Sequence, residues 1–235
     1  MTSVTAVSLT PNDSAVLGAL FDPEATLSGR PNIQSSISSG YDRETTDFLQ
    51  QQEVQLLSTI NDGDSSKVGL AEVISRLDDI VEKYPEYASA YNNRAQVRRM
   101  NMLWEDLLSS PDEWQLILSD LDRAISLASP PDMMQAISPL QARVLASAYT
   151  HRGYLLYKAS REEFPSSTIE SVPSMQGLER SVLEEMSSRD FGLGGKYGNK
   201  IAQRMAVETN PYAKLCGSIV KEALQREMDN YRQST

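Results

Sequence analysis

From about residue 42 onward, hydrophobic residues recur every three or four positions, which is the spacing of one face of an α-helix. The clearest example is segment 113–128, which places Ile117, Leu121 and Ile125 on one face and ends before two prolines. No segment shows the strict alternation of a half-buried strand. The same pattern predicts further helices over residues 43–61, 67–84, 86–100, 139–161, 178–191 and 199–208, with an irregular stretch at 101–112 and an acidic loop at 162–177. The sequence therefore predicts an all-α fold.

Residues 1–42 are predicted to form a tail that contains one short helix. Thr10 is a suitable N-cap, Pro11 can occupy the first helical position, and an apolar stripe follows as far as Phe21. Residues 28–40 have the Ser- and Gly-rich composition of a linker. Because a helix of about eleven residues is marginal alone in water, we expect helix 11–21 to pack against the helices of its own chain. The alternative is a helix that folds only in the groove of a partner.

Residues 210–235 are predicted to form a C-terminal capping helix. Asn210 is a suitable N-cap, Pro211 fits the first turn, and an apolar face extends to Ala223. That face would cover the end of a stack of helices. The single cysteine, Cys216, lies on this face, so we interpret it as a small core residue rather than as a nucleophile.

The composition narrows the classes of protein to consider. The 235-residue chain has a formal net charge of −10, which argues against a general affinity for nucleic acid or anionic lipid. No stretch approaches the roughly 20 apolar residues of a membrane span, and the first nine residues lack the pattern of a secretory signal. One cysteine and one histidine exclude an internal disulfide and a multi-cysteine or two-histidine metal site. We therefore expect a monomer in the cytoplasm, small enough to enter the nucleus, with no metal, no cofactor and no nucleic-acid or membrane partner.

Two segments repeat one pattern, namely an aromatic residue, an arginine three positions later and then a small residue. They are Ala90-Tyr91-Asn92-Asn93-Arg94-Ala95 and Ala148-Tyr149-Thr150-His151-Arg152-Gly153. This pattern is typical of the first helix of a tetratricopeptide repeat, a helix pair of about 34 residues. We expect three such repeats within residues 43–209, at about 43–85, 86–130 and 138–197, with insertions at 101–112 and 162–176. The predicted architecture is a tetratricopeptide-repeat superhelix of three helix hairpins with a C-terminal capping helix.

The chain resembles the tetratricopeptide repeat protein 36 family in four segments that follow the family's order. They are Thr10–Leu17, Ala88–Arg99, His151-Arg152-Gly153 and Asn210–Cys216. The resemblance implies a non-catalytic adaptor that binds a protein partner, with contact to an Hsp70-type chaperone and a role in protecting an enzyme of tyrosine catabolism. The alternative function is a structural component of a larger assembly, such as ciliary transport machinery.

In tetratricopeptide repeats, defined positions of each first helix face a concave groove, which is where such stacks usually bind. Here these positions carry amides, hydroxyls and cations, which suit the backbone of an extended peptide. The alternative is that they are only the solvated face of the stack. The predicted groove residues are Ser89, Asn92, Asn93, Gln96, Arg99 and Met100 from the second repeat, and Ser147, Thr150, His151, Tyr154, Tyr157 and Lys158 from the third.

Asn93 occupies the place of an asparagine in the carboxylate clamp of similar chaperone-binding repeats. That clamp binds a C-terminal Glu-Glu-Val-Asp tail and also needs a lysine and an arginine in the third repeat. This chain has Ser147 and His151 at those two places. We therefore do not expect an intact clamp.

Arg94 and Arg98 lie four positions apart and so share one face of a helix. Acidic residues on the neighbouring second helices offer them partners. We favour ion pairing over ligand contact for both arginines, and the candidate partners are Asp78, Asp79, Asp120 and Asp122.

The glycine-rich run from Gly192 to Gly198 lacks the spacing of a phosphate-binding loop. Asp190 and Tyr197 stand where that loop needs a glycine and a Ser or Thr. We interpret the run as a poorly formed helix end. His151 has no carboxylate pair or serine motif beside it in the sequence, and no other combination suggests general acid–base or covalent chemistry. The sequence therefore predicts that the protein is not an enzyme.

Overall fold

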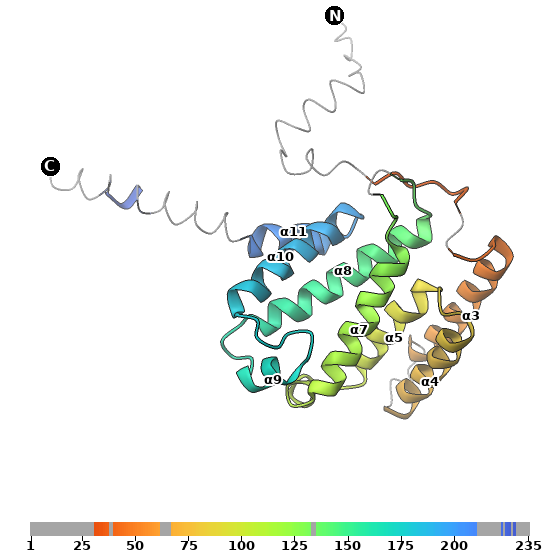
Figure 1. Ribbon diagram of the computed structural model, residues 1–235, viewed down its shortest axis with the longest axis horizontal. Helices are drawn as coiled ribbons and strands as arrows, with labels where there is room; N and C mark the ends of the chain where they lie inside the picture. The colour runs from red at the N-terminus through yellow and green to blue at the C-terminus, as the bar shows by residue number, and fades with distance from the viewer. Residues whose placement is uncertain are drawn as a thin grey trace, which may run out of the picture.

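The computed structural model describes residues 31–37, 40–61, 67–132 and 135–210, with the isolated positions 222, 224–226 and 228. The predicted helix at 11–21 and most of the predicted capping helix lie outside these residues. The described part is all-helical apart from a single bridge between Ile33 and Ile137 (Figure 1). Its helices are α3 (Arg43–Asn61), α4 (Lys67–Lys83), α5 (Ala88–Met100), α6 (Trp104–Leu108), α7 (Pro111–Ala128), α8 (Pro139–Ala159), α9 (Ser166–Ser171), α10 (Arg180–Lys196) and α11 (Lys200–Thr209).

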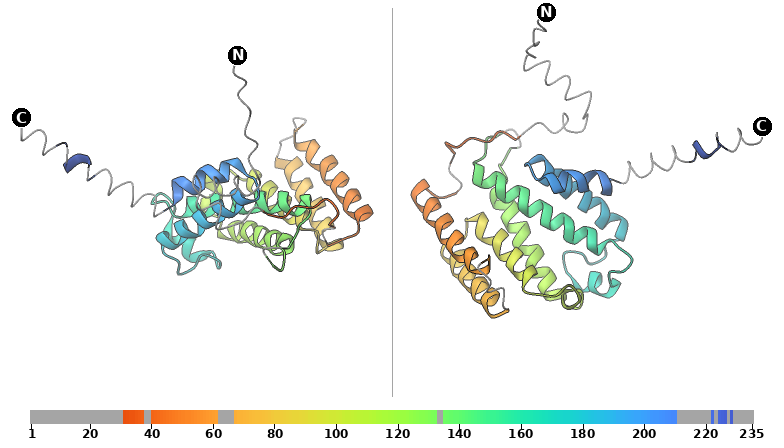
Figure 2. Two further views of the ribbon diagram at one scale, coloured as in Figure 1. Left: turned by 90° about the horizontal axis from the view of Figure 1, so that it is seen from above. Right: turned by 180° about the vertical axis from the view of Figure 1, so that it is seen from behind.

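The long helices pack as three hairpins that follow one another across the molecule. The pairs are α3 with α4, α5 with α7, and α8 with α10, and both further views in Figure 2 keep this order. Helix α5 also contacts α4 and α8, so the middle hairpin joins the outer two. None of the described helices combines the length and the apolar character that crossing a membrane requires.

Local sequence signals account for the helix boundaries that bear on the groove. Ser138 caps α8 by accepting a hydrogen bond from the backbone N–H of Gln141, whose side chain accepts one from the Ser138 backbone in return. Pro139 occupies the first turn of α8, where its missing N–H has no partner to lose. Just before this cap, Ile137 exchanges two backbone hydrogen bonds with residues 32 and 34. The segment 31–37 is thereby fastened to the start of α8.

The insertion at 101–112 contributes a short helix to the core, although its sequence suggested only an irregular stretch. Leu107 of α6 is fully buried, and Trp104 packs edge-to-face on the buried Trp114 of α7, with ring centroids 6.0 Å apart. Phe164, from the loop after α8, also packs edge-to-face on Trp114, with ring centroids 5.1 Å apart. The two tryptophans supply the apolar surface against which α6 and the loop after α8 pack.

The glycine-rich run at 192–198 holds a helix end, as predicted, but that end is well formed. Helix α10 continues through it to Lys196, because two of the glycines permit close helix packing. A Cβ at Gly194 would lie 2.7 Å from the Thr150 hydroxyl of α8, and one at Gly195 would lie 2.8 Å from Gln203 of α11. The run is therefore a packing surface between three helices.

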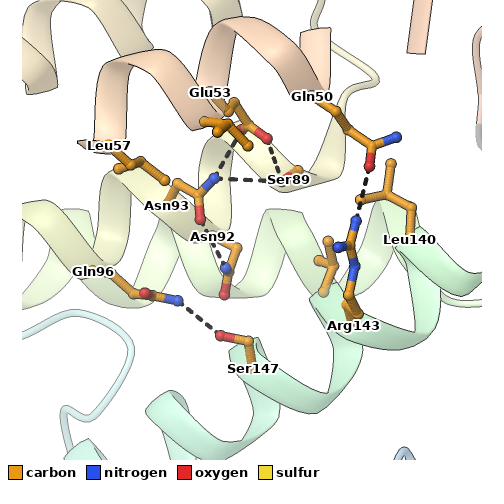
Figure 3. A pocket seen from close by; sticks show the side chains of 12 residues that line it. Gln50, Glu53, Leu57, Ser89, Asn92, Asn93, Gln96, Leu140, Arg143 and Ser147 are labelled. Atoms are coloured by element: carbon orange, nitrogen blue, oxygen red, sulfur yellow. Dashed lines mark hydrogen bonds between the residues drawn. The ribbon is translucent and has the colours of Figure 1, made fainter. Parts of the chain in front are cut away.

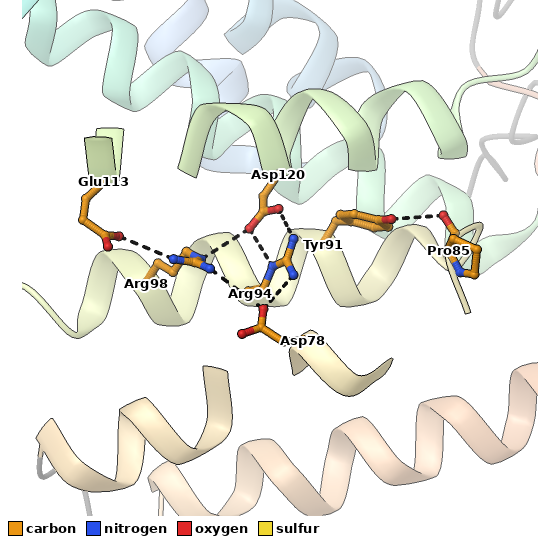
Figure 4. A network of polar contacts seen from close by, with 7 residues as sticks. All are labelled: Asp78, Pro85, Tyr91, Arg94, Arg98, Glu113 and Asp120. Atoms are coloured by element: carbon orange, nitrogen blue, oxygen red, sulfur yellow. Dashed lines mark hydrogen bonds and ion pairs between the residues drawn. The ribbon is translucent and has the colours of Figure 1, made fainter. Parts of the chain in front are cut away.

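The predicted pairing of Arg94 and Arg98 is confirmed. Arg94 donates to Asp120 of α7 at 2.9 and 2.5 Å and to Asp78 of α4 at 2.7 Å, and Arg98 lies within 3.8 Å of the same two carboxylates (Figure 4). Arg98 also lies 3.6 Å from Glu113.

The third hairpin contains the same arrangement as the second. Arg152 of α8 donates to Asp190 of α10 at 2.7 Å through two nitrogens, and to Asp122 of α7 at 2.6 Å. Burial disfavours the charged guanidinium, but the hydrogen bonds and charges of the two aspartates outweigh it and raise the pKa of Arg152. Each arginine thus joins its own hairpin to the preceding one.

Candidate binding groove on the face of α5 and α8

Helices α3, α5 and α8 line an open hollow of about 280 Å³, which we call the polar pocket. Figure 3 shows its side chains, which come from all three helices. Five of the twelve predicted groove residues line it. The lining consists of Gln50, Glu53, Val54 and Leu57 of α3, Ser89, Asn92, Asn93 and Gln96 of α5, and Leu140, Arg143, Val144 and Ser147 of α8.

Glu53 accepts hydrogen bonds from three side chains at this pocket. It is 5% exposed and accepts hydrogen bonds from the hydroxyls of Tyr87 at 2.9 Å and Ser89 at 2.7 Å and from the Asn93 amide at 2.9 Å. Burial raises the pKa of its carboxyl, and the three donors only partly offset that effect. The Ser89 hydroxyl and the Asn93 amide therefore already donate to Glu53 and are not free to bind a ligand.

The sequence contains a signal for Glu53 that the groove prediction missed. Glu53 stands four residues after Leu49 and four before Leu57, so it lies on the apolar face of α3. A carboxylate on a face that faces the core requires buried donors. The prediction considered only the first helices of repeats two and three, and so it omitted α3.

Asn92, a polar side chain of the pocket, has a buried hydrogen-bonding atom that no described residue uses. It is 5% exposed, and its amide nitrogen lies 3.4 Å from the Asn93 carbonyl oxygen, the atom to which it donates. Its own carbonyl oxygen is buried and has no partner among the described residues. A buried acceptor without a donor costs free energy.

Two hydrogen bonds tie the walls of the pocket together. Gln96 donates to the Ser147 hydroxyl at 2.8 Å, joining α5 to α8. Arg143 donates to Gln50 at 2.9 Å, joining α8 to α3. Neither bond uses a charged acceptor, but Arg143 lies close enough to Glu53 for its charge to offset part of the effect of burial on the pKa of that carboxyl.

Further along α5 and α8, four side chains form what we call the cation–aromatic cluster, made of Arg99, Trp104, Tyr154 and Lys158. The Arg99 guanidinium lies 4.7 Å from the centre of the Trp104 ring, and the Lys158 ammonium lies 5.6 Å from the same ring. Lys158 is also 5.6 Å from Tyr154, whose ring is 6.3 Å from Trp104. Three of these residues were predicted for the groove, whereas Trp104 comes from the insertion and was not.

His151 stands on α8 between the polar pocket and the cluster. Burial and the nearby charge of Arg99 lower its pKa to about 4, so its imidazole is neutral at physiological pH. Its Nδ1 atom is buried and has no hydrogen-bond partner in the described part of the chain. The described residues also contain no group of three His, Cys, Asp or Glu side chains that could hold a metal ion.

The remaining three predicted residues lie outside the pocket and the cluster. Thr150 donates to the backbone carbonyl of Ala146 at 2.5 Å and lies against Gly194, so it faces α10. Met100 is 56% exposed at the end of α5. The Tyr157 ring lies under the guanidinium of Arg161, 4.4 Å away.

Comparison with known proteins identifies the relatives of this chain. It is 41% identical to the L-tyrosine degradation gene cluster protein hmgX of Aspergillus fumigatus over 94% of each chain. It is also 26% identical to tetratricopeptide repeat protein 36 of Bos taurus and of Homo sapiens, over 92% of this chain and 94% of each relative. The chain belongs to the tetratricopeptide repeat protein 36 family.

These matches confirm the resemblance that the four sequence segments indicated. The relatives match over nearly the whole chain, so the match includes the helices of the groove. No model of a protein family matches the chain, and no solved structure matches it either.

Proposed function

We propose that this protein is a non-catalytic adaptor that binds an extended segment of a protein partner in the groove formed by the polar pocket and the cation–aromatic cluster. The observation that carries the proposal is the polar pocket, an open hollow of about 280 Å³ lined by amide and hydroxyl side chains. An extended peptide presents backbone N–H and C=O groups to such side chains without requiring a particular side chain of its own. The proposed architecture is a tetratricopeptide-repeat superhelix, closed by a capping helix at 210–235, that acts as a monomer.

The dimensions of the groove suit a short segment. Arg143 and Lys158 are fifteen residues apart on α8, which corresponds to about 22 Å at the rise of an α-helix. An extended chain covers that distance with about six or seven residues. The segment 31–37 and the short helix α6 lie near opposite ends of this length.

The names of the relatives suggest the kind of partner. One is named for an L-tyrosine degradation gene cluster, so we propose an enzyme of tyrosine catabolism as the partner of this chain. A chaperone tail is less well supported. Asn93, the single residue shared with the carboxylate clamp, already donates to Glu53.

A substitution that fills the pocket tests this proposal. Ser147→Arg places a long side chain in the polar pocket and leaves the donors of Glu53 untouched. Ser126→Arg is the matched control, because Ser126 is exposed on α7 and does not line the pocket. Affinity capture from an extract of the cells that express the protein, followed by cross-linking mass spectrometry, should recover a partner with the wild type and with the control.

The Ser147→Arg variant should lose that partner, and cross-links in the wild-type complex should fall on α5 and α8. If the variant keeps its fold, by circular dichroism and melting temperature, and still captures the same partner, the groove is not the binding site. A wild-type protein that captures no partner at all would contradict the adaptor function itself.

A further inference from the structure

The cations of this acidic chain differ in whether a carboxylate neutralises them. Arg94, Arg98 and Arg152, between the hairpins, each lie within 3.8 Å of at least two carboxylates. In the part of the chain that the structure describes, no carboxylate lies within ion-pairing distance of Arg99 or Lys158. The groove therefore retains positive charge in a protein whose net charge is −10.

Packing holds these two groove cations in position before any ligand arrives. Arg99 donates to the backbone carbonyl of Met102 at 3.0 Å while its guanidinium lies over Trp104. Trp104 is in turn held edge-to-face by the buried Trp114. The Lys158 ammonium lies against the rings of both Trp104 and Tyr154, 5.6 Å from each ring centre. Little side-chain entropy is then lost when an anion binds, which favours affinity.

Two titratable side chains near the groove cations have environments that disfavour their charged forms. His151 is neutral at physiological pH because its pKa lies near 4. Burial raises the pKa of Glu53 and so disfavours the negative form of the carboxyl that faces the polar pocket. Tyr154 is 41% exposed and Leu103 is 61% exposed, so apolar surface lies next to the cations.

We propose that the segment bound in the groove is acidic, with one Asp or Glu carboxylate held by Arg99 and Lys158 and a neighbouring apolar or aromatic side chain on Tyr154. Hydrogen bonds from cationic donors to a carboxylate are stronger than neutral ones. This site differs from the chaperone-type clamp, whose third-repeat cations are replaced here by Ser147 and His151. The inference rests on the proposed function and adds the chemical class of the partner.

Selection from a displayed library of random octapeptides against the full chain tests the inference. Peptides retained by the wild type should be enriched in Asp and Glu over the input library. The double variant Arg99→Gln, Lys158→Gln should lose this enrichment. The control Arg123→Gln, Lys200→Gln removes the same charge from exposed positions on α7 and α11 and should retain it.

A selected acidic peptide should then bind the double variant about tenfold more weakly than the control, because truncating cations at a partly desolvated site raises the dissociation rate. Its Gln-for-Glu copy should bind both variants equally weakly. Selected peptides without acidic enrichment, or with equal enrichment on the double variant, would overturn the inference. If such peptides are still lost on Ser147→Arg, the proposed function stands. If the wild type retains no peptide above a protein-free control, both fail.

Discussion

Glu53, which is buried, and His151, whose Nδ1 atom is buried, affect the charge of the groove in opposite ways, because an uncharged carboxyl removes a negative charge and an uncharged imidazole removes a positive one. Burial raises the pKa of the carboxyl and lowers the pKa of the imidazole, so both environments favour the uncharged form. Their effects on stability have opposite signs with pH. A comparison of variants at the two positions can therefore separate them.

Glu53→Gln keeps the shape of the side chain and an acceptor for Asn93 while it removes the charge. A raised folded-state pKa means that the stability Glu53 contributes is complete below its ordinary pKa of 4.5 and is lost as pH rises through the folded-state value. The glutamine variant should lack this decline. Urea unfolding measured from pH 4.5 up to neutral pH would show it as a flatter curve than that of the wild type.

Glu53→Ala should behave differently, because it leaves Tyr87, Ser89 and Asn93 without their shared acceptor. Unsatisfied buried donors and the cavity should together cost about 2–4 kcal/mol of unfolding free energy. Glutamine should cost clearly less. Equal losses for the two variants would show that the hydrogen bonds do not depend on Glu53.

His151 should make the protein less stable in mild acid. Above pH 6.5 its imidazole is neutral in both the folded and the unfolded chain. As pH falls from 6.5 toward about 4, the unfolded chain takes up a proton that the folded chain resists, so stability falls, on the order of 2–3 kcal/mol in all. His151→Gln cannot titrate, so its stability curve should be flatter than the wild type's in this window. Parallel curves would contradict the lowered pKa.

At the scale of elements, close helix packing determines which positions require a small residue, and residue type alone does not show this. Helix α10 carries glycines at 192, 194 and 195, and each position meets a different environment. The face of α10 that contacts α8 and α11 needs small residues, and the exposed face does not. The two faces therefore predict opposite effects of the same substitution.

Gly194→Ala should destabilise the protein, since the new Cβ would lie 2.7 Å from the Thr150 hydroxyl and 3.1 Å from Ala202. We expect a loss of about 1–3 kcal/mol from overpacking. Gly192→Ala is the control, because nothing lies within 4 Å of its Cβ, and it should stabilise the helix by about 0.5–1 kcal/mol. Chemical denaturation of both variants measures the difference. A stabilising Gly194→Ala would show that α8 and α10 can separate at little cost.

The sequence predicts the long helices well because their apolar periodicity is local, as in α7 with Ile117, Leu121 and Ile125. It also predicts the pairing of Arg94, because the aspartates recur at fixed positions of the second helices. It does not predict α6 or the place of Trp104, which depend on contact with Trp114 and Tyr154. Such contacts join residues ten to fifty positions apart and have no local signature.

The groove residues likewise include some whose position the sequence predicts and some whose position it does not. Helical spacing places Asn92, Asn93, Gln96 and Ser147 on one surface, and the polar pocket contains all four. The same spacing also selected Thr150, which turns toward α10 because glycine leaves room there. Which side of a helix meets solvent depends on the neighbouring helix, and the sequence of one helix does not contain that information.

At the scale of the whole molecule, arginines connect the three hairpins, and Arg98 supports Arg94 at the same two carboxylates. Arg94 joins α5 to α4 and α7, and Arg152 joins α8 to α7 and α10. In a stack of repeats, stability depends on such contacts between neighbours as well as on each repeat alone. Removing one of these arginines should therefore weaken a hairpin and its attachment together.

Arg152→Met should lower the unfolding free energy by about 3 kcal/mol, because it leaves the nearly buried carboxylate of Asp190 without its partner. The double variant Arg152→Met, Asp190→Leu should recover most of that loss, since an apolar pair of similar size avoids the uncompensated charge. Arg204→Met, at an exposed position of α11, should change stability by less than about 0.5 kcal/mol. Urea unfolding of the three variants beside the wild type tests this, and a double variant less stable than the single one would show that the carboxylate does not need Arg152.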